Sequence, residues 1–521
     1  MMYGAVSSTD EPANTGENLM ADEQQKENED VPSMEEDKEP IDSNGKAANE
    51  SETPTDPDEV EITESPRPRC FPDKYMLPAK FSYFFVMAKD SCYQPYFILF
   101  LIGVGMSPRE AAFINGIRLI GMMSGVIFWG HMSDKKQNHK HVILILTVVG
   151  MILMVLNPLM AIAVGDKKRN ICPYPMDTVG NEALKIEASF WVLLFLNIVA
   201  SFFDGCTVSF VDAGVIQRIN VSNQPKDFGF NRLFGVFGFS IGSLVSSLVI
   251  KNFPTGDTNC YTGIFILHVV FSLGLIVSSY FLFRGADMKI PHKERNLNVR
   301  NQVWKTFSQI DNLMFLVTLL VMGTMQGVFI SFTSLQLKNL NAPTEALGLT
   351  TMIAAMSTGP ATARSTKLIG LFKNTWNVTI FGCFTYFVRY IAFAYITDPW
   401  IALPISIFQF FGLGLFIIAT IHHVKSISIP QIYTTMYGIA NATHFGFGFI
   451  LANVIYGQIY KFYGGKTMFI VAGSTAGVWT AVLVIYKAFR KVVAPDVDGN
   501  QELESEPDEK LRIRGESMRF M

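Results

Sequence analysis

Residues 141–164 read HVILILTVVGMILMVLNPLMAIAV, a stretch that contains no Asp, Glu, Lys or Arg. At a rise of about 1.5 Å per residue, a helix of this length crosses the hydrocarbon core of a bilayer, which is about 30 Å thick. Because lipid offers the backbone no hydrogen-bond partner, such a stretch must be helical. It therefore predicts a membrane-spanning α-helix.

Comparable apolar blocks recur along the chain. Of its 521 residues 49% are hydrophobic, and they gather in long uncharged blocks rather than in the shorter amphipathic patterns of water-soluble helices. The blocks predict spanning helices near residues 80–104, 109–130, 141–164, 188–216, 232–251, 262–283, 312–336, 345–370, 377–397, 401–423, 431–460 and 467–489. The fold class is therefore an all-α membrane protein with about twelve transmembrane helices.

A polar, basic stretch divides these helices into two sets of six. The predicted parts are an acidic cytoplasmic tail (1–79), an N-terminal half (80–283), a basic linker (284–311), a C-terminal half (312–489) and a second tail (490–521). The first tail is too acidic and too poor in apolar residues to form a core, which predicts disorder. Two pseudo-symmetric halves predict a binding site between them at mid-membrane.

Basic residues in the short loops set the orientation. Lys135, Lys136 and Lys140 lie between the second and third predicted helices, and the other even-numbered loops are basic as well. By the positive-inside rule, both termini face the cytoplasm. The sequence leaves open whether the membrane is the plasma membrane or an endolysosomal one, and we expect a monomer in the bilayer.

Several charged side chains fall inside predicted spans: Lys89, Asp90, Arg118, Asp204 and Arg389. A charge at this depth costs free energy unless it is paired or hydrated, so each is a candidate for binding a substrate or a coupling ion. The alternative for the first four is a set of internal salt bridges that holds the N-terminal half together. Lys89 and Asp90 point about 100° apart on a helix, so we expect them not to pair with each other.

Asp90 and Asp204 are the candidates for proton coupling, because a medium of low polarity favours the neutral acid. A paired base would instead keep either carboxylate ionised. His268 and His444 are titratable too, but a lone histidine inside a membrane is more often a hydrogen-bonded structural residue. Pro95, just beyond this region, predicts a bend in the first helix.

The six cysteines show no metal-ligand spacing. Cys172 and Cys260 fall in loops assigned to the outer side, where an oxidising compartment would allow a disulfide; two unpaired thiols are the alternative. The sequence predicts no metal, no cofactor, no binding of nucleic acid and no enzymatic activity. The expected partners are the lipid bilayer, a small-molecule substrate and, if transport is coupled, protons.

The stretch Gly130-His131-Met132-Ser133-Asp134-Lys135-Lys136 lies in the loop predicted after the second helix. It resembles the signature of the major facilitator superfamily, in which a small residue and an Asp followed by a base join helices two and three. The resemblance implies that Gly130 permits close helix contact and that Asp134 and Lys135 belong to a cytoplasmic gate.

A narrower resemblance concerns three stretches, 80–85 (KFSYFF), 228–239 (FGFNRLFGVFGF) and 456–465 (YGQIYKFYGG). They are similar to the lactose permease-like branch, which includes major facilitator superfamily domain-containing protein 6 and its relatives. The resemblance covers roughly residues 80–490 and neither tail.

This branch implies roles for particular residues. Asp212 and Arg232 match the positions that hold sugar in lactose permease, and Phe239 matches its stacking aromatic, a Trp there. Arg389 matches an Arg on helix nine. The proton machinery is not matched, because residues 350–363 contain no carboxylate and Gln409 stands in a region where the permease has a His and a Glu.

These observations predict a secondary transporter that moves a small polar organic solute by alternating access. The eighth helix, which lacks a carboxylate, and Gln409 favour a uniporter, or a symporter whose coupling carboxylates all lie in the N-terminal half. The alternative from another class is a receptor or scaffold that retains the fold without transport. Neutral replacements of Lys89, Asp90 or Arg389 that leave folding intact would be tolerated only by the receptor or scaffold.

Overall fold

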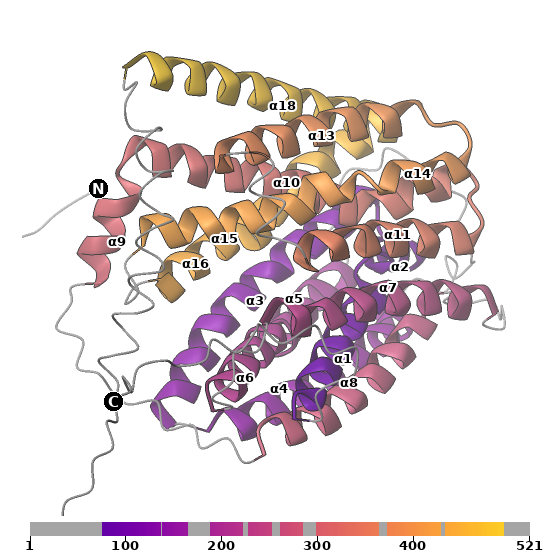
Figure 1. Cartoon of the computed structure of the whole chain (residues 1–521). Helices are drawn as coiled ribbons and strands as arrows, with labels where there is room; N and C mark the ends of the chain where they lie inside the picture. Colours follow the sequence, from indigo (N-terminus) through magenta and orange to yellow (C-terminus); the bar gives the residue numbers. More distant parts are fainter. Residues whose placement is uncertain are drawn as a thin grey trace, which may run out of the picture. The chain divides into compact units, whose positions relative to one another are not determined.

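The computed structural model describes residues 75–136, 138–164, 188–221, 228–252, 261–284, 299–363, 372, 374–428 and 433–493. These residues belong to one compact unit, Cys70–Met521 (Figure 1). The predicted N-terminal tail up to residue 74, Cys172, Cys260 and most of the C-terminal tail lie outside the described residues.

The first half of the described chain is helical. Its elements are α1 (Leu77–Tyr93), α2 (Phe97–Gly103), α3 (Pro108–Lys136), α4 (His139–Val164), α5 (Ala188–Asp204), α6 (Thr207–Val221), α7 (Phe228–Asn252) and α8 (Gly263–Leu282). The bend predicted at Pro95 is confirmed, because α1 ends at Tyr93 and α2 begins at Phe97. The single helix predicted over 188–216 is instead two helices, which break at Gly205 and Cys206.

The second half follows a short helix, α9 (Val299–Phe307), within the predicted basic linker. Its elements are α10 (Ile310–Asn339), α11 (Thr344–Ala363), α13 (Thr375–Tyr395), η2 (Pro399–Ile401), α14 (Ala402–Ser406), η3 (Phe410–Leu415), α15 (Phe416–Ile427), α16 (Tyr433–Asn441), η4 (Ala442–Gly448), α17 (Phe449–Leu451), η5 (Ala452–Tyr456) and α18 (Gly457–Val493). Within α18 the chain turns sharply at Gly464, whose φ of 76° is favourable for glycine and strained for other residues.

Nine of the described helical segments are long and apolar enough to cross a membrane. The last of them, Thr435–Arg490, contains two crossings because Gly464 divides it. The bent pair α1–α2 and the less apolar α11 supply the remaining crossings, in agreement with a count of 12. The predicted fold class is therefore confirmed.

Each half packs mainly against itself. In the first half α1 lies against α7 and α8, and α5 lies between α3 and α4; in the second half α13 packs on α18 and α10 on η4. The halves meet where α7 contacts α11 and where α3 contacts η5 and α18. Gly238 permits the close packing of α7 on α1, because a Cβ there would collide with the backbone of Phe84.

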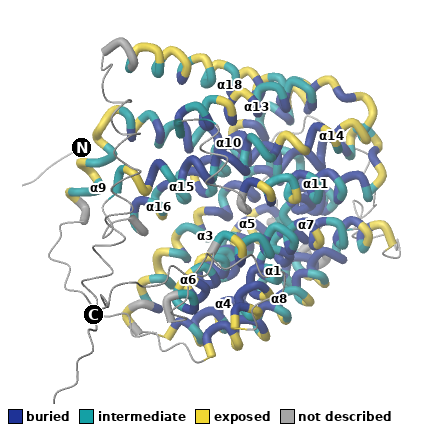
Figure 2. Tube along the Cα trace, in the orientation of Figure 1, coloured by how far each residue is buried: buried dark blue, intermediate teal, exposed yellow. Residues whose placement is uncertain are grey.

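The outer faces of the bundle carry large apolar side chains. Ile127 is 74% exposed, Phe195 70% and Val277 59%, and Figure 2 shows exposed segments along the edges of α18 and buried ones along α10. So much continuous apolar surface is unfavourable in contact with water and favourable in contact with lipid. The polar side chains that matter for function are therefore the ones turned inward.

Candidate functional site

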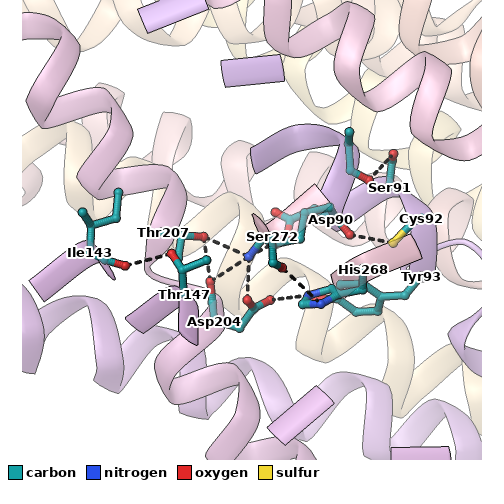
Figure 3. A network of polar contacts seen from close by, with 12 residues as sticks. Asp90, Ser91, Cys92, Tyr93, Ile143, Thr147, Asp204, Thr207, His268 and Ser272 are labelled. Carbon is teal, nitrogen blue, oxygen red and sulfur yellow. Dashed lines mark hydrogen bonds and ion pairs between the residues drawn. The ribbon is translucent and has the colours of Figure 1, made fainter. Parts of the chain in front are cut away.

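A buried ionic cluster joins three helices of the first half: Lys89 and Asp90 on α1, Asp204 at the end of α5, and His268 on α8 (Figure 3). The Lys89 ammonium lies 2.6 Å from Asp204 Oδ1, and it donates a further hydrogen bond to Thr207 Oγ1 at 3.0 Å. Lys89 is fully buried and Asp204 is 2% exposed. The cluster is therefore shielded from solvent in this conformation.

The break between α5 and α6 places Asp204 for this contact. Its backbone carbonyl lies in the last turn of α5 and accepts from Lys89 Nζ at 3.4 Å. A helix C-terminus carries partial negative charge, which favours a cation there. Gly150 on α4 makes room for Asp204, because a Cβ at that position would lie 2.9 Å from the Cβ of Asp204.

Both carboxylate oxygens of Asp204 have partners. Oδ1 binds Lys89, and Oδ2 lies 3.4 Å from His268 Nε2. The other ring nitrogen of His268 lies 3.4 Å from Ser272 Oγ. Asp204 is thus the carboxylate that Lys89 and His268 hold in place.

Asp90 has looser contacts. Its Oδ1 lies 3.5 Å from Lys89 Nζ, and its side chain is 15% exposed. The cluster contains two carboxylates, Asp90 and Asp204, and one ammonium group, that of Lys89, so the carboxylates outnumber the lysine. Asp90 is therefore the carboxylate that lies outside the tight Lys89–Asp204 pair.

The expectation that Lys89 and Asp90 do not pair was wrong. The 100° between neighbouring residues separates their Cβ atoms, but a lysine side chain is long and flexible enough to reach the neighbouring carboxylate. Arg118 lies outside the ionic cluster, so the predicted set of salt bridges holds for Lys89, Asp90 and Asp204 only, among the residues described.

Arg118 instead belongs to a polar contact between the halves. It donates to Asn115 Oδ1 at 3.0 Å and to the Tyr93 hydroxyl at 3.3 Å. The amide nitrogen of Asn115 then donates across the halves to Ser331 Oγ at 3.0 Å and Asn453 Oδ1 at 2.9 Å. The ring of Tyr93 also packs edge-on against His268 at 5.6 Å between centroids, so this contact adjoins the ionic cluster.

The residues implied by the lactose permease resemblance are brought together in part. Arg232 Nη2 lies 3.9 Å from Asp212 Oδ2, and the Tyr83 hydroxyl donates to Asp212 Oδ1 at 2.6 Å. The side chains of Arg232 and Asp212 are 31% and 27% exposed. Phe239 lies two turns further along α7 and is half-buried.

Arg389 and Gln409, which lie in the second half, are in direct contact. Arg389 Nη1 donates to Gln409 Oε1. Gln409 Nε2 in turn donates to Gln326 Oε1 at 2.7 Å, which also accepts from the Tyr386 hydroxyl at 2.7 Å. Arg389 is 1% exposed.

The signature residues Gly130, Asp134 and Lys135 do not form a loop. The helix α3 continues to Lys136, so they lie in its last turns. Nothing lies within 4 Å of a Cβ built on Gly130, so the expected close helix contact is absent among the described residues. Lys135 is exposed, and the side chain of Asp134 lies outside the described residues.

Three neutral side chains of these networks, those of Asn115, Gln326 and Thr207, could not be found from charges inside the spans. The available signal was an amide or hydroxyl inside an apolar span, since a buried polar group needs a hydrogen-bond partner. That signal is frequent in membrane helices, so it marks candidates without selecting among them.

Comparison with known proteins shows the family and the fold that this chain resembles. A family model described as the MFS_1 like family matches residues 76–471. The nucleoside transporter NupG superposes with a TM-score of 0.61 at 14% identity, covering 79% of this chain and 99% of its own. The xylose transporter XylE from E. coli gives 0.54 at 12% identity, covering 79% and 96%. A POT family transporter crystallised with a thioalcohol-conjugated peptide gives 0.55 at 11%, covering 79% and 95%.

Proposed function

The chain belongs to the MFS_1 like family, and from this we propose that it moves a small polar organic solute across its membrane by alternating access. It is an integral membrane protein of the major facilitator superfamily. NupG, XylE and the POT transporter are described as carrying or holding a nucleoside, xylose and a peptide, all small polar organic molecules. The observation that carries the proposal is the buried cluster of Lys89, Asp90, Asp204 and His268, whose charges are costly in a membrane bundle.

Transport is coupled to protons through Asp90. Its carboxylate is the less tightly held of the two in the cluster, and its protonation would leave one carboxylate, that of Asp204, facing the one ammonium group of Lys89. A cluster with matched charges costs less to enclose away from water while the halves change conformation. Asp204 serves to hold Lys89 and His268, and it remains ionised.

The finer assignments are also proposals. The chain belongs to the lactose permease-like branch with the domain-6 proteins, which is supported by the contact between Asp212 and Arg232. It acts as a monomer with both termini in the cytoplasm, in the plasma membrane or an endolysosomal membrane. We also propose that the chain is divided as the sequence predicts, into a tail (1–79), two halves (80–283 and 312–489) joined by a linker (284–311), and a second tail (490–521).

Replacing Asp90 with Asn tests coupling. Purified protein in vesicles is offered pooled labelled metabolites with and without an inward-acid pH gradient. A gradient of one pH unit supports about tenfold accumulation at one proton per solute, since it is worth about 1.4 kcal/mol. We expect wild-type protein to accumulate solute, and Asp90→Asn to exchange solute without accumulating it.

The matched control is Asp398→Asn. Asp398 is exposed and its side chain caps η2 by accepting from Trp400 N, a role that asparagine also performs. Accumulation should persist in this variant. Accumulation that persists in Asp90→Asn would contradict coupling at Asp90. No uptake of any solute by folded wild-type protein would overturn the transport proposal and favour a receptor or scaffold.

A further inference from the structure

Arg389 lies in an aromatic enclosure formed by α10 and α13. Its guanidinium carbon lies 3.6 Å from the ring centroid of Phe329 and 5.9 Å from that of Phe393. Tyr386 and Tyr390, stacked on each other at 5.8 Å, are on the same helix as Arg389. The Phe329 ring covers one face of the guanidinium plane and contributes a cation–π interaction. Hydrogen bonds therefore have to be made at the edges of the plane.

One nitrogen of Arg389 is satisfied and two are not. Nη1 donates to Gln409, whose own amide is fixed by Gln326. Nε and Nη2 are buried and have no hydrogen-bond partner among the described residues. These two nitrogens share one edge of the guanidinium plane. The edge presents two parallel N–H groups, which is the geometry that binds a carboxylate through both oxygens.

Two other arginines of this protein have partners for their guanidinium groups. Arg218, also buried, donates to the backbone carbonyls of Tyr75, Phe281 and Leu282. Arg232 faces the carboxylate of Asp212. No acid lies within ion-pair distance of Arg389 in the described part of the chain. A fully buried cation with a free donor edge is costly unless an anion meets it at some stage of the working cycle.

We propose that the Nε–Nη2 edge of Arg389 binds a carboxylate of the transported solute. The inference rests on the proposed transport function and specifies its substrate class as an organic anion or zwitterion. Gln409 and Gln326 hold Nη1 so that the opposite edge keeps a fixed direction. The phenyl ring of Phe329, whose centroid lies 3.6 Å from the guanidinium carbon, favours an apolar solute body beside the edge over a hydration shell.

The first test compares carboxylates with their neutral amides. Thermal unfolding of the purified protein is measured with acetate, lactate and benzoate, and with acetamide, lactamide and benzamide, at matched ionic strength. We expect stabilisation by at least one carboxylate and none by its amide. Replacing Arg389 with Gln should weaken that binding roughly 30-fold or more, because it removes the charged partner of a buried pair.

A second variant separates binding from folding. Gln409→Glu places a carboxylate beside Arg389, compensates its charge within the protein and competes with the solute. We expect this variant to fold, because the new carboxylate pairs with Arg389 although it loses the donor to Gln326, and to lose stabilisation by carboxylates. Gln302→Glu on α9, half-buried and remote from Arg389 in sequence and element, is the matched control and should bind as the wild type does.

Three results would overturn the assignment: equal stabilisation by amides and carboxylates, equal stabilisation by sodium chloride, or unchanged carboxylate binding in Gln409→Glu. Exchange of these carboxylates and amides, in labelled form, across the membrane of vesicles that contain the protein distinguishes the carboxylate site from the transport function on which it rests. Carboxylates that bind through Arg389 without being exchanged support the site and contradict transport. Exchange of neutral solutes with no binding of any carboxylate supports transport and contradicts the site.

Discussion

Replacing Asp204 with alanine is expected to lower the free energy of unfolding by about 3–5 kcal/mol, the largest stability effect we predict for one side chain. The substitution leaves the fully buried Lys89 ammonium without the oxygen that lies 2.6 Å away. Asp90 at 3.5 Å compensates only in part, because its own contact with Lys89 is longer. Equilibrium unfolding in mixed micelles measures the change.

The double variant Lys89→Met, Asp204→Leu is the control. Removing both charges and filling the space with apolar groups is expected to restore stability to near the wild-type value, since the desolvation of both ions is avoided. The two single losses should therefore be far from additive. A loss below about 1 kcal/mol for Asp204→Ala would show that the pair is effectively solvated and would contradict its description as buried.

The double variant also separates stability from function. A buried ion pair contributes little net stability compared with an apolar replacement, so the fold does not require it. If the apolar variant folds and no longer accumulates solute, the charges are retained for transport. The cluster would then resemble other intramembrane charges, whose cost is offset by function rather than by folding.

Hydropathy located the spanning helices because the bilayer imposes one length and one backbone solution on every crossing. The stretch 141–164 appears as α4, His139–Val164, with ends shifted by two residues or fewer. The break at Gly205, between α5 and α6, was missed because hydropathy reports only the length and apolarity of a span. Hydropathy sums side chains over a window and does not register local packing, such as that at Gly205, where an added Cβ would collide with Met122 Cγ.

The candidate site was predictable residue by residue and unpredictable as a set of contacts. The cost of a charge in lipid identifies Lys89 and Asp204 as candidates from sequence alone. Their pairing depends on two segments 115 residues apart meeting at one depth, which requires the packed bundle. The pairing of Arg389 with Gln409 was likewise inaccessible, because nothing in a neutral amide indicates that it faces an arginine.

Replacing Gly348 with valine is expected to hold the halves apart at one end and to reduce uptake about tenfold or more. Gly348 on α11 faces α7, and a Cβ there would lie 2.5 Å from Ser247 Cβ and 3.1 Å from the Ser243 carbonyl. About one turn away, Lys251 and Glu345 form an ion pair between the same two helices. Bulk at this crossing therefore penalises the state in which this end is closed.

The size of the shift follows from the cost of overpacking. Forcing additional carbons into a filled contact typically costs 1–3 kcal/mol. A bias of that size between two states changes their ratio about 5- to 150-fold. Because alternating access requires both states, a protein held largely in one of them should exchange solute slowly even though its binding residues are intact.

Spin labels report the predicted change directly. They are attached at Asn252→Cys and Tyr395→Cys, exposed positions near this end of the two halves, in a chain whose 6 native cysteines are replaced by serine. Gly348→Val should move the distance distribution toward longer values. Gly438→Val is the matched control, because nothing lies within 4 Å of a Cβ at that position. Unchanged distances in Gly348→Val, or the same lengthening in Gly438→Val, would show that the α7–α11 crossing does not control closure.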